Sequence, residues 1–256
     1  MTRYLFPVIA AVTTAAAQPA VETGREIALK AQAALYGFQT LTVSGEMTLR
    51  RGAEVIGQRT IALEMIEQKA AEEYDQARVT ITAPSALKDT RLLSWSRVKG
   101  DDQQWLVTPR TGRVQKIAER GRQAAFVSSD FSYEDILKWQ VDAYEYTRAG
   151  QQKCDADPCT VVDARPRNRY SNYLLLKVYY DDRYRIRRID YFADRTDKPR
   201  KTLIQSDYLQ FGGTWQPSRS MITDVQRNTS TAIVWSGYHL NAPIDQRIMS
   251  PNATQP

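Results

Sequence analysis

Segments in which apolar and polar residues alternate recur along most of this chain. In residues 41–49, the apolar side chains of Leu41, Val43, Met47 and Leu49 are separated mostly by polar ones. Because successive side chains of a β-strand point to opposite faces, this period of two predicts a strand with one apolar and one polar face. A chain made of many such segments is expected to fold mainly as antiparallel β-sheet.

The other segments of this kind are short and divided by turn signals. Predicted strands cover residues 61–65, 78–83, 91–98, 104–107, 113–117, 173–180 and 231–240. Pairs such as Gly212-Gly213 mark hairpin turns between strands. Two helices are expected. Apolar residues at helical spacing predict the first, over residues 19–36, and Ser132 in a suitable N-cap position predicts the second, over residues 132–139.

The first 17 residues have the three parts of a secretory signal peptide. Met1-Thr2-Arg3 carries one positive charge, residues 4–17 are uncharged and mostly apolar, and Ala15-Ala16-Ala17 supplies small residues before the cleavage point. A membrane anchor is the alternative, but the apolar run is shorter than the roughly 20 residues of a spanning helix. We therefore expect cleavage near Ala17 and a periplasmic mature chain, residues 18–256. No linker or repeat divides that chain, which favours a single domain.

The two cysteines, Cys154 and Cys159, have four residues between them in a predicted turn. An exported protein meets an oxidising compartment, where such a pair can form a disulfide. A metal site is the alternative, but two thiolates do not fill a tetrahedral shell, and the single histidine, His239, is distant in sequence. The spacing therefore predicts a disulfide-bonded hairpin and no metal site.

Two late predicted strands, residues 173–180 and 231–240, are apolar on both faces. In the first, Leu176 and Val178 share one side, and Tyr179 lies on the other. Such strands must be covered on both faces. Either both faces are packed core, as in a two-sheet sandwich, or one face lines a cavity. The pattern leaves these two interpretations open.

The chain carries no pattern of a known catalytic site. The motifs of serine hydrolases, zinc peptidases and nucleotide-binding loops do not occur in it, and both cysteines are expected to be oxidised. His239 lies in a strand pattern beside Tyr238, and pairs such as Asp181-Asp182 fall in predicted turns rather than in an apolar pocket. The sequence therefore predicts a protein that is not an enzyme, with no catalytic residue and no cofactor.

Basic residues exceed acidic ones, for a formal net charge of +6. The densest basic group, Arg183, Arg185, Arg187 and Arg188, has the alternation of a strand and is interpreted as a solvated strand face. Export argues against nucleic acid as a ligand. An anionic surface or an acidic partner protein is the alternative for this face.

Several segments, taken in order, resemble a known protein family. They are residues 102–109 (DQQWLVTP), 113–117 (RVQKI), 129–135 (SDFSYED), 206–208 (SDY), 212–219 (GGTWQPSR) and 224–226 (DVQ). Together they look like the outer-membrane lipoprotein-sorting protein family, which is related to the periplasmic lipoprotein carrier LolA. The chain departs from the family at Ser128, where glycine is common, and at Val107, where an aromatic residue is common.

The resemblance implies a mainly β fold of the LolA/LppX-like kind, with a few helices. Its strongly curved antiparallel sheet is an unclosed half-barrel covered by helices. Relatives of this fold shelter acyl chains in an apolar cavity, and each CH₂ group removed from water contributes about 0.8 kcal/mol. The candidate lipid-binding residues are Val43, Met47, Leu63, Met65, Trp95, Trp105 and Trp235.

The resemblance also implies a function and its partners. We expect a monomeric periplasmic carrier that binds a lipid or the acyl chains of a lipoprotein and moves it toward the outer membrane. An inner-membrane transporter would supply the cargo, and an outer-membrane acceptor would receive it. The alternative is an accessory protein without cargo, which docks on an envelope transporter or assembly complex through the basic strand face.

Overall fold

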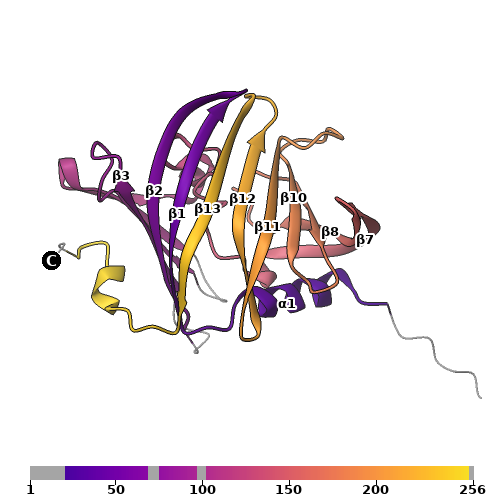
Figure 1. Cartoon of the computed structure of the whole chain (residues 1–256). Coiled ribbons are helices and arrows are strands. Elements are labelled where there is room, and N and C mark those ends of the chain that lie inside the picture. Colours follow the sequence, from indigo (N-terminus) through magenta and orange to yellow (C-terminus); the bar gives the residue numbers. More distant parts are fainter. Residues whose placement is uncertain (1–20, 69–74, 97–101, 254–256) are drawn as a thin grey trace, which may run out of the picture.

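The computed structural model describes residues 21–68, 75–96 and 102–253 (Figure 1). The expected signal peptide, residues 1–17, lies outside the described residues, as does the end of the strand expected over residues 91–98. In the described ranges, one α-helix, α1 (Gly24–Leu35), precedes a single antiparallel sheet of thirteen strands. The prediction of a mainly β chain is confirmed.

The sheet has two halves, and within each half strands that are consecutive in the chain lie side by side. The first six are β1 (Thr40–Arg51), β2 (Glu54–Ile66), β3 (Asp75–Ala83), β4 (Arg91–Ser96), β5 (Gln103–Thr108) and β6 (Arg113–Ile117). The other seven are β7 (Tyr144–Cys154), β8 (Asp157–Pro166), β9 (Leu175–Tyr180), β10 (Ile186–Phe192), β11 (Lys201–Phe211), β12 (Thr214–Asp224) and β13 (Thr229–Leu240). Their order across the sheet is β6-β5-β4-β3-β2-β1-β13-β12-β11-β10-β9-β8-β7.

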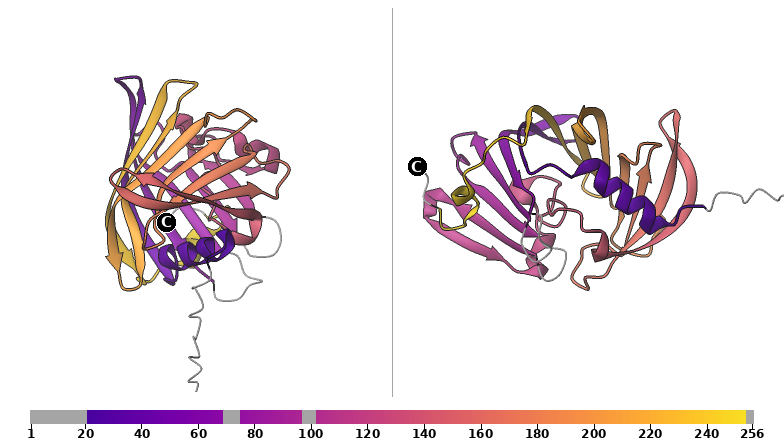
Figure 2. Two further views of the ribbon diagram at one scale, coloured as in Figure 1. Left: turned by 90° about the vertical axis from the view of Figure 1, so that its right-hand side faces the viewer. Right: turned by 90° about the horizontal axis from the view of Figure 1, so that it is seen from below.

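The sheet is bent into a trough rather than closed into a barrel. β1 pairs with β13 in the middle, and β6 and β7 end the order without pairing to each other. Figure 2 shows the resulting U, viewed from below, with α1 lying across one end of it. Strands twist in a fixed sense, and a long sheet relieves the accumulated twist by curling, which gives it a concave and a convex face.

The apolar residues that alternate in the sequence are buried on the concave face of the sheet. In β1, Leu41, Val43, Met47 and Leu49 are all buried, while the residues between them are largely half-buried or exposed, apart from Gly45. The largest core cluster joins inward side chains of both halves of the sheet; Ile81, Val178, Ile222 and Ile233 are among its members. Burial of this apolar surface is the main force that holds the two halves together.

The helix α1 is shorter than the sequence pattern predicts. Thr23 caps it: the hydroxyl of Thr23 accepts a hydrogen bond from the Glu26 N–H at 3.2 Å, and the Glu26 carboxylate accepts one from the Thr23 N–H at 2.7 Å. This reciprocal capping box fixes the start of the helix at Gly24, five residues after Pro19. Ile27, Ala28 and Ala31 form its buried stripe. Within the described ranges, no helix has the length and apolarity needed to cross a membrane.

The prediction of a second helix, over residues 132–139, is wrong. Ser132 and Asp135 do exchange the two bonds of a helix start, at 2.7 and 3.3 Å, but the chain continues only as turns. The acidic side chains of this turn bind other parts of the molecule. Asp135, for example, accepts a hydrogen bond from the Tyr173 hydroxyl at 2.8 Å. These tertiary bonds hold the segment in place without a regular helix.

Residues 118–143, which we call the crossing segment, connect β6 to β7 over the concave face. They include the short 3-10 turns η2 (Glu119–Gln123), η3 (Phe126–Ser128) and η4 (Val141–Ala143). Phe126 and Phe131 are buried in the core cluster, and Tyr133 packs against it. In the described residues, this irregular segment crosses the concave face where the sequence predicted helices covering the sheet.

The cysteine pair closes the hairpin between β7 and β8. Cys154 and Cys159 are disulfide-bonded, with their Cα atoms 5.7 Å apart, as predicted. Both pack with Val161 and Tyr179 in a small cluster of their own. The neighbouring Val178 belongs to the main core instead, so β9 is buried on both faces, as its sequence indicates.

Candidate functional site

An apolar cavity of about 250 Å³ lies between the concave face and the crossing segment. Inward residues of β1–β4 and β11–β13 form its walls, and Leu35, Tyr36 and Phe38 close it beside the end of α1. Phe126 and Phe131 of the crossing segment form another part of the lining. The volume is slightly below the range of about 300–1,000 Å³ that is typical of small-molecule sites.

Five of the seven candidate lipid-binding residues line this cavity. They are Val43, Met47, Leu63, Met65 and Trp235. Met47 and Met65 lie in neighbouring strands, so two flexible thioethers face the hollow, where they can adapt to different ligand shapes. Contact of these residues with a lipid stays a prediction.

The other two candidates, Trp95 and Trp105, do not line the cavity. Leu92 and Ser94 of β4 face it, so the alternation of the strand turns Trp95 to the opposite face. There its ring meets that of Trp105 edge-on at 4.9 Å, and its indole N–H donates to the Met249 carbonyl at 3.0 Å. The C-terminal turn η5 (Gln246–Met249) thus helps to cover these indoles on the convex side.

Gly45 makes room for the Trp235 side chain in the cavity wall. A Cβ atom at residue 45 would lie 2.8 Å from Cε3 of Trp235 and 3.0 Å from the Ile233 side chain. The indole N–H of Trp235 donates to the Ser220 hydroxyl at 3.3 Å, which holds the ring near the β1 backbone. A glycine inside a strand often marks such a close approach, and this signal was available in the sequence.

Two charged side chains border the mainly apolar cavity, and both are paired. The Lys138 ammonium lies 2.8 Å from Asp75 and 3.1 Å from Glu67. Asp135 lies 3.2 Å from the ammonium of the buried Lys201. Pairing offsets the cost of removing these charges from water, so the cavity wall presents no isolated charge from either residue. No pattern in the sequence indicated that Lys138 or Lys201 would lie at the cavity.

Asp130 fastens the crossing segment to β13. Its carboxylate accepts hydrogen bonds from the hydroxyls of Thr229 and Thr231, the latter at 2.7 Å, and its N–H donates to the Thr231 oxygen at 3.0 Å. Lys201 donates to the Asp130 carbonyl at 2.8 Å. All of these groups except Thr229 are buried. These contacts anchor the crossing segment to the sheet.

A second hollow of about 110 Å³ lies on the other side of the crossing segment, against β7–β10. Its lining is polar and aromatic: the Trp139 and Tyr144 rings stack at 4.5 Å. Glu134 accepts hydrogen bonds from the Ser171 hydroxyl and from the Asn172 N–H. Burial nevertheless raises the pKa of Glu134 above its ordinary value. The apolar cavity is therefore the better site for a hydrocarbon ligand.

The basic group is a strand face only in part, because Arg183 and Arg185 precede β10. Its side chains make contacts within the molecule. Arg185 lies 2.7 Å from Asp181, and Arg188 lies 2.8 Å from Asp190. The guanidinium groups of Arg183 and Arg185 also lie over the Trp215 ring, at 4.9 and 4.8 Å. This face is therefore a mixed-charge, aromatic surface rather than a row of unpaired cations.

The fold of the chain has counterparts among solved structures. An outer membrane lipoprotein-sorting protein domain from Vibrio parahaemolyticus is 25% identical and superposes with a TM-score of 0.83 over 90% of this chain and 97% of that one. A DUF1329 family protein from Desulfovibrio piger is 22% identical and superposes with a TM-score of 0.82 over 89% of this chain and 95% of that one. A LolA superfamily protein from Nitrosomonas europaea is 14% identical and superposes with a TM-score of 0.69 over 90% of this chain and 98% of that one. No curated protein matches the chain in sequence.

The unclosed antiparallel sheet and these solved structures define a LolA-like fold, and the resemblance seen in the sequence is confirmed. A family model described as "Uncharacterized protein" matches residues 73–254. The chain belongs to that family.

Proposed function

We propose that this protein is a periplasmic carrier that binds a lipid, or the acyl chains of a lipoprotein, in the apolar cavity and moves it toward the outer membrane. The observation that carries the proposal is the cavity itself, a hollow in the core with Val43, Leu63 and Met65 in its walls. Unfilled apolar space costs stability, and an acyl chain would restore the missing contacts. The lipoprotein-sorting domain among the relatives supports the same class of cargo.

The size of the cavity limits how cargo can enter. At about 250 Å³ it holds less than a drug-sized ligand in the state described. A longer chain would need side chains to move, and Met47 and Met65 are flexible enough to do so. The crossing segment is the other wall that can shift, since it lacks regular secondary structure around Phe131. We therefore expect uptake of a single acyl chain to be easier than uptake of several.

The test is binding of a fluorescent fatty-acyl probe to the purified mature protein and to Leu63→Asn. The asparagine places an amide in the wall of the hollow, which disfavours hydrocarbon more than it disfavours folding. We expect the wild-type protein to take up probe and Leu63→Asn to bind about tenfold less tightly, from a loss of about 1.4 kcal/mol.

Leu209→Asn is the matched control, because Leu209 is an exposed leucine outside the cavity lining. It should bind the probe like the wild-type protein. Native mass spectrometry of protein taken from the periplasm gives the independent reading. Protein that carries no lipid and takes up no probe would contradict the carrier proposal and support the accessory role.

A further inference from the structure

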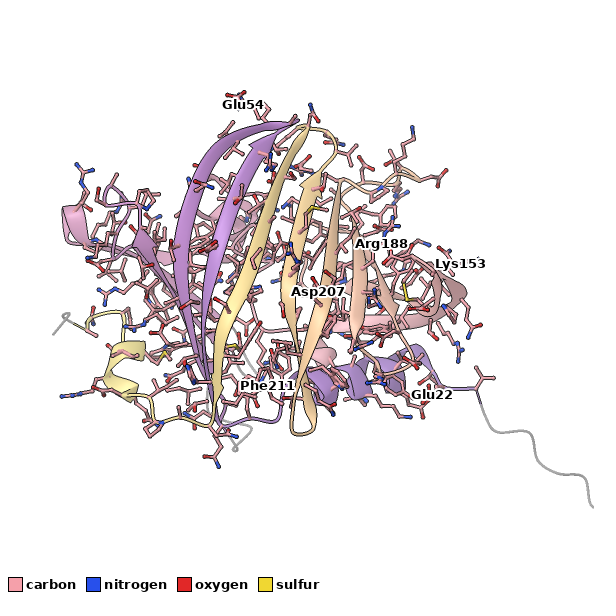
Figure 3. All side chains as sticks on the ribbon, in the orientation of Figure 1. Glu22, Glu54, Lys153, Arg188, Asp207 and Phe211 are labelled. Carbon is pink, nitrogen blue, oxygen red and sulfur yellow. A yellow bond between two sulfur atoms is a disulfide. The ribbon has the colours of Figure 1, made fainter. Side chains whose placement is uncertain are left out.

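Two hairpin turns meet at the end of the sheet opposite α1. The Gly52 N–H, between β1 and β2, donates to the Asn228 carbonyl, between β12 and β13, at 2.9 Å. Figure 3 labels Glu54 at this end and Phe211 at the other. We call residues 50–56 and 225–229 the tip.

The tip exposes aliphatic side chains where turns are usually polar. Val55 and Ile56 are each 44% exposed, and Val225 is 63% exposed. They lie on both of the adjoining hairpins. The two hairpins thus present exposed apolar side chains among polar ones at one end of the sheet, as a surface that contacts another apolar medium does.

Arginines surround these aliphatic residues. Arg50, Arg51 and Arg227, together with Ser128 and Thr229, line an open hollow of about 510 Å³ at the tip. The side chain of Arg227 is 59% exposed. Guanidinium groups bind phosphate oxygens through paired hydrogen bonds, and such a hollow has room for a phosphate group.

The carboxylates near the tip are mostly used inside the molecule. Asp224 has a side chain only 1% exposed and lies 3.8 Å from Arg200 and 3.7 Å from Arg227. Asp130, in the floor of the hollow, is bonded to threonine hydroxyls. Glu54 is exposed. The surface of the tip is therefore positive as well as partly apolar.

We propose that the tip docks on an anionic phospholipid surface. The phosphates lie against Arg50, Arg51 and Arg227, and Val55, Ile56 and Val225 enter the layer below the headgroups. An acidic protein would match the arginines alone, whereas a membrane interface matches both the charge and the aliphatic side chains, since arginine keeps its charge at the headgroup level while its stem lies along apolar surface. This inference does not depend on cargo in the cavity.

The experiment is co-sedimentation of the purified mature protein with vesicles of phosphatidylglycerol and phosphatidylethanolamine, or of phosphatidylcholine alone. We expect binding to the anionic vesicles, weakened by high salt. Arg51→Gln should bind about fivefold less tightly, the share of one arginine at an anionic surface. The triple variant Val55→Ser, Ile56→Ser, Val225→Ser should lose at least as much.

Matched controls lie elsewhere on the sheet. Arg113→Gln removes an exposed arginine of the edge strand β6. The triple variant Ile204→Ser, Met221→Ser, Val234→Ser removes three apolar side chains that are each 40–42% exposed. Both should bind like the wild-type protein, as should the cavity variant Leu63→Asn. Wild-type protein that stays in solution with anionic vesicles would overturn the proposal, as would controls that lose as much binding as the tip variants.

Discussion

Gly45 and Trp235 determine one wall of the cavity at the scale of single residues. The glycine leaves the β1 backbone bare, and the indole lies where a Cβ atom would otherwise be. We expect Gly45→Ala to push the ring away and to lower the free energy of unfolding by about 1–3 kcal/mol, the usual cost of overpacking. Urea unfolding measures this, and the acyl probe reports the altered cavity. Ser44→Ala is the control, because Ser44 is the neighbouring residue and is exposed. Equal effects of the two substitutions on stability would contradict this role for Gly45.

At the scale of elements, the crossing segment depends on its polar anchors rather than on helix formation. Asp130→Ala leaves the buried Thr231 hydroxyl without its carboxylate partner, and we expect a loss of about 1–3 kcal/mol in the free energy of unfolding. Glu145→Ala is the control, since Glu145 of β7 forms an exposed ion pair with Arg167 and its loss should cost at most about 1 kcal/mol. Denaturant unfolding of both variants makes the comparison. Equal stability would show that the segment is held by its aromatic residues alone.

The whole molecule is expected to be exported, cleaved and oxidised. Intact mass of protein from a bacterial periplasm should lack residues 1–17 and two hydrogens, the latter for the Cys154–Cys159 bridge. Maleimide added after unfolding without reductant should label no cysteine, and after reduction it should label both. A mass equal to that of the full-length chain would contradict cleavage. Labelling of cysteine before reduction would contradict the disulfide. The bridge closes a short loop, so its removal should have only a small effect on stability.

Sequence alone determined what depends on local geometry. Period two indicated eight of the thirteen strands, among them β6, whose boundaries agree with the predicted range, 113–117. The cysteine spacing gave the disulfide, and the apolar residues on both sides of β9 gave a strand covered on both faces. These features are readable because strand alternation and a close cysteine pair are set by residues only a few positions apart.

Tertiary structure alone decided which strand face is concave and what covers it. Period two separates Leu92 from Trp95 in β4, but only the curvature of the sheet turns Leu92 toward the cavity and Trp95 toward η5. Likewise, a good helix start at Ser132 is not continued, because Asp135 binds Tyr173 and Lys201, which lie far along the chain. Curvature and such distant pairings are properties of the assembled sheet, so no local pattern contains them.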